Sequence, residues 1–172
     1  MPVNSYKWLP YRLGAWIRKE WKVPDETTSV PFTPLSRPLE EIRFALVTTG
    51  GLYLKATQQP FDIEREASEP DWGDPTFRII PRDTEQREIG VAHLHYNPKD
   101  VERDFNILLP INRFVEMEAA GEIGSLAPSS YSVMGDQGHP WPHWDLWRDR
   151  YGPEMLARMK SEDVGAVLLT PA

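Results

Sequence analysis

The chain has 172 residues, of which 40% are hydrophobic and 26% charged, as expected for one globular domain. Its formal net charge of −7, without any basic run, argues against a nucleic-acid partner. No apolar run is long enough to cross a bilayer, and the N-terminus lacks a secretory signal, so we expect a cytoplasmic protein without a membrane partner. Cysteine is absent, which excludes disulfides, thiolate metal sites and a cysteine nucleophile within these residues.

Residues 1–40 are rich in tryptophan and proline. Trp8, Trp16 and Trp21 alternate with prolines, and a short helix is predicted over about residues 11–21. The aromatic side chains of such an N-terminal arm pack either on their own domain or on a neighbouring subunit. We therefore divide the chain into an arm at 1–40 and an α/β domain at 41–172.

The first buried strand is predicted over Phe44–Thr48, followed by the loop Thr48-Thr49-Gly50-Gly51. Two glycines permit positive φ and a close approach of the backbone to a ligand. The loop lacks the third glycine of the dinucleotide fingerprint and the lysine of a phosphate loop. It is either an anion-binding turn or an ordinary connection after a strand.

Residues 58–88 are polar and rich in Asp, Glu and Pro, and only Thr76–Ile80 has strand character. The segment is interpreted as a long insertion or an active-site loop. His93 and His95 follow it and, two apart on a strand, would point to the same face. They could bind a metal, transfer a proton or hydrogen-bond a substrate, or be structural. No third ligand is evident near them, so no metal site is predicted.

Residues 104–135 are interpreted as the central unit. Asn106–Leu109 is predicted as a buried strand that stops at Pro110, and Ile111–Ala119 as an amphipathic helix that ends at Gly121. Residues 124–131 then form a small-residue loop with several hydroxyls. Such a unit either is an ordinary part of the fold or binds a ligand, because α/β folds place ligands at the carboxyl ends of their strands.

The chain closes with a loop over 134–147, a helix over Pro153–Lys160 and a strongly apolar segment, 164–170, predicted as a buried strand. The expected fold is α/β, with a Rossmann-like, mostly parallel sheet and flanking helices. Because helices are few and none caps the last strand, we expect an incomplete fold and a chain that is the N-terminal portion of something longer.

Six segments in order resemble the selenoprotein B family of glycine, sarcosine, betaine and D-proline reductases, most closely the D-proline-reductase-like branch. They are Ala45–Gly51, Gly73–Arg78, His93–Tyr96, Asp104–Ile107, Gly124–Ala127 and Gly165–Pro171. In that family a selenocysteine or cysteine follows the last of these strands almost at once. The resemblance therefore implies that the redox nucleophile lies just beyond Ala172, and that this chain is a truncated form, a fragment or a split subunit.

The resemblance also implies a function, reductive cleavage of a C–N bond in a small amino acid or amine with a dithiol donor. A pyruvoyl group on a partner subunit would activate the substrate, within an oligomer of reductase subunits. Thr48, Thr49, Gly50, Ser125, Tyr131 and Thr170 are expected to bind substrate, and His93 and His95 to transfer a proton. The chain alone is expected to be inactive. The alternative is a non-catalytic α/β binding or scaffolding subunit that lacks the redox nucleophile.

Overall fold

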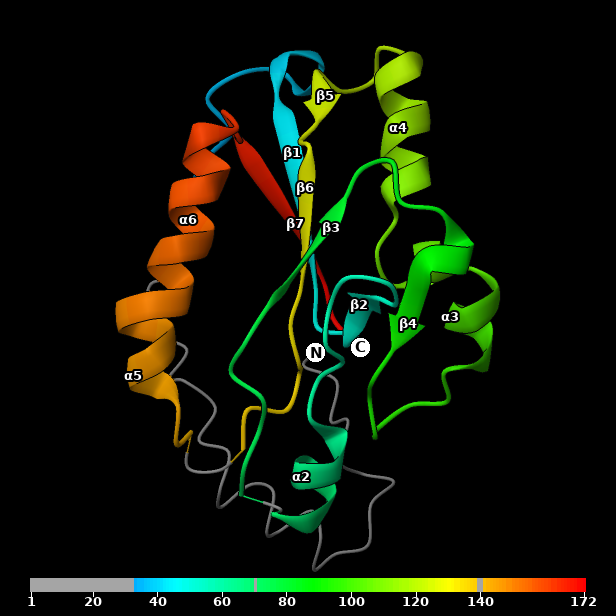
Figure 1. Ribbon diagram of the computed structural model, residues 1–172. Helices are drawn as coiled ribbons and strands as arrows, with labels where there is room; N and C mark the ends of the chain where they lie inside the picture. The colour runs from blue at the N-terminus through cyan, green and yellow to red at the C-terminus, as the bar shows by residue number, and fades with distance from the viewer. Residues whose placement is uncertain (1–32, 70, 139–140) are drawn as a thin grey trace, which may run out of the picture. The chain divides into compact units, whose positions relative to one another are not determined.

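The computed structural model describes residues 33–69, 71–138 and 141–172 (Figure 1). Within them, Leu35–Ala172 form one compact unit. The predicted helix over 11–21 and the three tryptophans of the arm lie outside the described residues. The strands are β1 (Arg43–Thr48), β2 (Leu52–Leu54), β3 (Arg78–Pro81), β4 (Ile89–Val91), β5 (Ser125–Leu126), β6 (Ser129–Ser132) and β7 (Ala166–Thr170). The helices are α2 (Ile63–Ser68), α3 (Lys99–Arg103), α4 (Ile111–Ala119), α5 (Trp144–Leu146) and α6 (Gly152–Ser161), with short 3₁₀ turns η2 (Leu39–Glu41), η3 (Gln86–Glu88) and η4 (Phe105–Ile107) and the π-helical turn η5 (Trp147–Tyr151).

Strand β1 is the centre of the main sheet. One of its edges pairs in parallel with β5 near its start and with β6 near its end, and its other edge pairs in parallel with β7 along most of its length. Strand β3 joins β6 in the antiparallel direction, and β2 and β4 form a separate antiparallel pair. The sheet is therefore mixed, and the predicted α/β class is confirmed. The more specific Rossmann-like description stays a prediction.

The side chains of β1 alternate between two apolar layers. Leu46 belongs to a cluster that includes Val101 of α3 and Ile111 of α4, whereas Ala45 belongs to a cluster with Met159 of α6. Since successive residues of a strand face opposite sides, β1 places α3 and α4 against one face and α6 against the other. Figure 1 shows α6 and α4 on opposite sides of the sheet.

The strand predicted over Asn106–Leu109 is wrong, because Asn106 and Ile107 belong to the 3₁₀ turn η4, and Leu108 and Leu109 follow it without strand structure. The Asp104 carboxylate accepts hydrogen bonds from the backbone N–H of Asn106, at 3.0 Å, and from its side-chain amide, at 2.8 Å. Such local side-chain bonds offer the backbone an alternative to a sheet ladder. The helix after Pro110 is confirmed as α4.

The loop predicted over 124–131 is also wrong, because β5 and β6 lie there. All four residues of β6 are buried, among them Ser129, Ser130 and Ser132. Serine has little intrinsic strand preference, and here the neighbours β1 and β3 impose the conformation. Ala127 and Pro128 separate the two strands.

The last helix and strand lie where the sequence predicted them and are α6 and β7. The prediction that this strand is buried is wrong. Val167, Leu168 and Leu169 are all exposed, the last by 70%. Among the described residues β7 pairs only with β1, so it is an edge strand. The helix also begins earlier than expected, since α5, η5 and α6 follow one another from Trp144.

Residues 58–88 contain the predicted strand, as β3, and also a helix that the sequence pattern did not indicate. Helix α2 begins after Asp62, whose side chain accepts a hydrogen bond from the Arg65 N–H at 3.0 Å. Asp74, buried, accepts from the Asp62 N–H at 3.1 Å and so ties α2 to the segment before β3. The acidic insertion is therefore partly regular structure.

Candidate functional site at the carboxyl edge of the sheet

The carboxyl ends of β1, β6 and β7 meet at one edge of the sheet, because the three strands run in parallel. Thr48 is paired with Ser132 on one side and with Thr170 on the other. Parallel α/β sheets place ligands at this edge. We therefore take the segments that follow these three strands as the candidate site.

The turn after β1 depends on both glycines. Gly51 has a φ of 64°, and a Cβ there would lie 2.2 Å from the Ala92 carbonyl oxygen. A Cβ at Gly50 would lie 2.5 Å from the Leu108 side chain. The Gly51 N–H donates to the Val133 carbonyl at 3.2 Å, and its carbonyl accepts from the Ala92 N–H at 2.9 Å. The turn thus joins the loop after β4 to the loop after β6.

The threonine hydroxyls at this edge bond mostly to the protein itself. Thr48 Oγ1 donates to the Thr170 carbonyl at 3.2 Å and accepts from the Gly50 N–H at 3.1 Å. Thr170 Oγ1 is in contact with the carbonyls of Val47 and Leu108. Thr49, half-buried, has its Oγ1 bonded by the Ala172 N–H at 2.8 Å. Thr48, Thr49, Gly50 and Thr170 are thus brought together, as expected, although their role with substrate stays a prediction.

Two of the predicted substrate-binding residues lie elsewhere. Ser125 pairs with Arg43 at the start of β1, and its Oγ accepts from Arg43 Nε at 3.0 Å. Tyr131 is fully buried in the cluster beneath α6, where burial raises the pKa of its hydroxyl to about 12. The structure therefore does not bring Ser125 and Tyr131 to the same mouth as the threonines.

His93 and His95 are not on a strand, so the expectation that they share a strand face is wrong. They follow β4 in an irregular loop, with ring centroids 5.6 Å apart and planes nearly perpendicular at 88°. Tyr96 fixes this loop, since its hydroxyl donates to the Gly50 carbonyl at 2.6 Å. Burial, followed by the neighbouring His95 ring, lowers the pKa of His93. The loop nevertheless brings both histidines to the carboxyl edge.

His95 lies between two carboxylates that the sequence did not indicate as site residues. Its Nε2 is 2.9 Å from Glu66 Oε1 on α2 and 3.5 Å from Asp136 Oδ2 in the loop after β6. The Glu66 side chain is only 4% exposed, and burial raises the pKa of its carboxyl against the opposing effect of the His95 hydrogen bond. We call Glu66, His95 and Asp136 the edge cluster.

The edge cluster adjoins the threonine turn. A Cβ at Gly135, the residue before Asp136, would lie 3.4 Å from the Thr49 side chain. Asp136 follows the end of a strand, a position from which the sequence could have indicated a site residue. Asp62 could have indicated the start of the helix that carries Glu66, because aspartate is a common helix-capping residue. No sequence pattern pairs Glu66 with His95, because 29 positions separate them.

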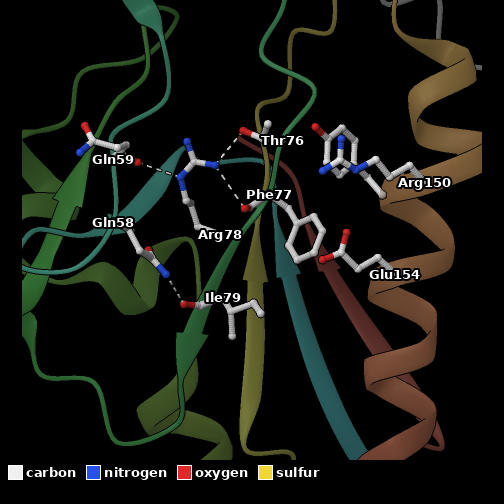
Figure 2. Close-up of a pocket in the computed structure, with 9 residues that line it drawn as sticks. Gln58, Gln59, Thr76, Phe77, Arg78, Ile79, Arg150 and Glu154 are labelled. Carbon is white, nitrogen blue, oxygen red and sulfur yellow. Dashed lines mark hydrogen bonds between the residues drawn. The ribbon is translucent and has the colours of Figure 1, made fainter.

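A separate open cavity of about 490 Å³ lies between β3 and the start of α6 (Figure 2). Its polar lining includes Arg78, Arg150 and Glu154, and none of the predicted site residues. Arg78 is already bonded to the Gln59 and Phe77 carbonyls and to Thr76 Oγ1, as the dashed lines in Figure 2 show. We do not assign it as the site, because Arg78 is already occupied and none of the predicted site residues lines it.

The fold and the edge cluster define an α/β protein with a polar site at the carboxyl ends of parallel strands. The chain belongs to the glycine/sarcosine/betaine reductase selenoprotein B family, whose model matches residues 14–172. It is 33% identical over 139 residues to the D-proline reductase subunit gamma of Acetoanaerobium sticklandii, a match that covers 81% of this chain. It is 28% identical over 141 residues to the glycine reductase complex component B subunit gamma of Carboxydothermus hydrogenoformans, over 82% of this chain.

The chain spans only part of these relatives, 52% of the first and 30% of the second. Both relatives are named as subunits of reductases. No solved structure matches this chain. Among the helices of the described residues, none has the length and apolar character needed to cross a membrane.

Proposed function

We propose that this chain is the N-terminal part of a reductase subunit that cleaves a C–N bond of a small amino acid or amine, of the glycine, betaine, sarcosine or D-proline class. Family membership over residues 14–172 is the observation on which the proposal rests. We infer that the protein works in the cytoplasm with other reductase subunits, where thiol donors are kept reduced.

The carboxyl edge gives this proposal a place for the chemistry. Ala172 follows β7 and is hydrogen-bonded to Thr49, whose side chain lies near Gly135, next to the edge cluster. A selenocysteine or cysteine that follows Ala172 in the whole protein would therefore lie close to Thr49. That residue would supply the nucleophile, a pyruvoyl group on a partner subunit would activate the amine, and a dithiol would supply the two electrons.

The residues of this chain would bind and orient the substrate. The turn at Thr49–Gly51 is held by its neighbours, because its glycines lie against Ala92 and Leu108 and its backbone is bonded on both sides. When no cation is bound, His95, half-exposed beside two carboxylates, could exchange a proton with the substrate. Positioning by such fixed groups lowers the entropic part of a reaction barrier.

The exposed apolar side chains of β7 support the view that the sheet of the whole protein extends beyond β7, its outermost strand in the described residues. Val167, Leu168 and Leu169 are apolar, exposed and on an edge strand. Natural proteins usually cover such an edge. A further strand of the whole subunit would pair with the backbone of β7, and helices packed on the two faces of the sheet would bury these side chains.

The test measures turnover by the protein isolated from its own organism together with its partner subunits. Glycine, betaine, sarcosine and D-proline are each incubated with a dithiol, and cleavage of the C–N bond is followed by mass spectrometry. We expect turnover of one of these substrates. Without turnover of any, the proposal is wrong and a non-catalytic binding or scaffolding subunit is the remaining assignment.

Replacement of Thr49 tests whether the carboxyl edge is involved. Thr49→Val keeps the shape of the side chain but removes the hydroxyl that accepts from Ala172, so kcat/KM should fall by at least about tenfold. Thr57→Val removes an exposed hydroxyl from the turn after β2 and should leave kcat/KM unchanged. Equal activity of the two variants would exclude the Thr49 hydroxyl from the site.

A further inference from the structure

We propose that the edge cluster binds a divalent transition-metal cation, with His95 Nε2 and one carboxylate oxygen each of Glu66 and Asp136 as its ligands. One imidazole nitrogen and two carboxylate oxygens suit zinc and also other first-row divalent ions. Three protein ligands leave at least one coordination position open, as in catalytic rather than structural zinc sites.

The distances fit such an ion. The ligand atoms of the three residues all lie within 4.8 Å of one another. The Nε2 atom of His95 is 2.9 Å from Glu66 Oε1 and 3.5 Å from Asp136 Oδ2. A cation with ligand bonds of about 2.0–2.2 Å separates its ligand atoms by roughly 3–3.5 Å. The two separations from His95 are close to this range, whereas the two carboxylates, which lie within 4.8 Å of each other, would move together by up to about 1 Å.

The second carboxylate oxygen of Glu66 independently indicates a missing partner. Glu66 Oε2 is buried and accepts no hydrogen bond from the described residues, and the side chain as a whole is 96% buried. A buried carboxylate oxygen without a donor is costly, and the cost is removed when the group is paired or coordinates a metal. The unpartnered oxygen belongs to the same carboxylate that contacts His95.

The surrounding structure fixes the backbone that carries His95 and Glu66, and it orients the Asp136 side chain. His93 Nδ1 accepts from the His95 N–H at 3.1 Å, and the Gly138 N–H donates to Asp136 Oδ1 at 2.8 Å, which leaves Oδ2 directed at His95. Glu66 is held on α2, whose first turn is capped by Asp62. A bond such as the one from Gly138 to Asp136 orients a metal ligand.

The competing explanation is an ordinary ion pair, in which a protonated His95 lies between two carboxylates. The two explanations differ in what they predict for metal binding. A cation is bound by a neutral imidazole, so metal binding releases any proton held by His95. If the three residues form only an ion pair, the protein binds no metal there.

The test is a titration of the metal-stripped protein, produced from its whole coding region, with Zn²⁺ by calorimetry, and with Co²⁺ by its visible absorption. We expect one ion per chain. His95→Ala and Asp136→Asn change half-exposed side chains, so both variants should fold, and each should weaken binding by at least about 100-fold. His143→Ala, which removes a histidine outside the edge cluster, should bind as the unaltered chain does.

Either of two results would overturn the proposal. One is a chain that binds neither ion, and the other is a His95→Ala variant that binds as tightly as the unaltered chain, because the ion would then be held elsewhere. Circular dichroism of each variant identifies any loss of fold. The titration requires no turnover, so it can succeed or fail independently of the proposed reductase function.

Discussion

At the scale of single residues, two neighbouring positions require glycine for different structural reasons. Gly50 is limited by the Leu108 side chain, which can move, whereas Gly51 is limited by the Ala92 carbonyl and by a positive φ. The sequence indicated a glycine turn after the first strand but not which backbone would approach it. That backbone comes from the loop after β4, some 40 residues later, and local pattern contains no information about it.

Gly51→Ala should lower the free energy of unfolding by more than about 2 kcal/mol, because a positive φ alone costs about 1–2 kcal/mol and a backbone carbonyl stands in the way. Gly121→Ala is the matched control. Gly121 has a φ of 74° but no atom within 4 Å of the added Cβ, so only the conformational cost remains. Urea denaturation measures both. Equal losses for the two variants would show that the close approach at Ala92 has no energetic consequence.

At the scale of elements, Glu118 joins α4 to the sheet. Its Oε2 accepts from the Leu126 N–H of β5 at 2.9 Å and from Arg82 Nη2, after β3, at 2.9 Å. The hydrogen bond from Leu126, and then the one from Arg82, lower the pKa of the Glu118 carboxyl. The Glu118 carboxyl thus binds its proton more weakly in the folded state than in the unfolded state. The free energy of unfolding gained in this way is present above the unfolded pKa and is lost as the pH falls through the folded pKa.

Glu118→Gln should therefore lower the free energy of unfolding by about 1 kcal/mol at pH 7 and by progressively less toward pH 3. Glu116→Gln, on the exposed face of the same helix, should change it by less than about 0.5 kcal/mol. Urea denaturation at several pH values supplies the comparison. A Glu118→Gln difference that stays constant or grows in acid would contradict the assigned role.

The sequence predicted those elements whose pattern is local and strong. The apolar run of β1, the amphipathic period of α4 and the proline at the start of α6 each determine their own element. Strand β6 was missed because its serines become strand only between β1 and β3, and η4 because Asp104 bonds its own backbone. The histidines of the candidate site were predicted, but their carboxylate partners were not, because tertiary contacts alone bring Glu66 and Asp136 to His95.

At the scale of the whole molecule, the chain forms an α/β unit whose polar groups gather where three parallel strands end. The last of these strands, β7, is apolar and exposed, and Ala172 after it is bonded to Thr49 beside the edge cluster. The chain spans 52% of its D-proline reductase relative. Under the proposed function, this chain would supply the binding edge and a further segment of the subunit the redox residue.

The intact mass and selenium content of the protein isolated from its own organism test this account most directly. We predict a mass well above 19.8 kDa, with one selenium atom or one reactive thiol located by peptide mapping just beyond Ala172. A mass equal to that of the 172 residues, without selenium, would contradict the account, because the nucleophile would then have to come from a different polypeptide.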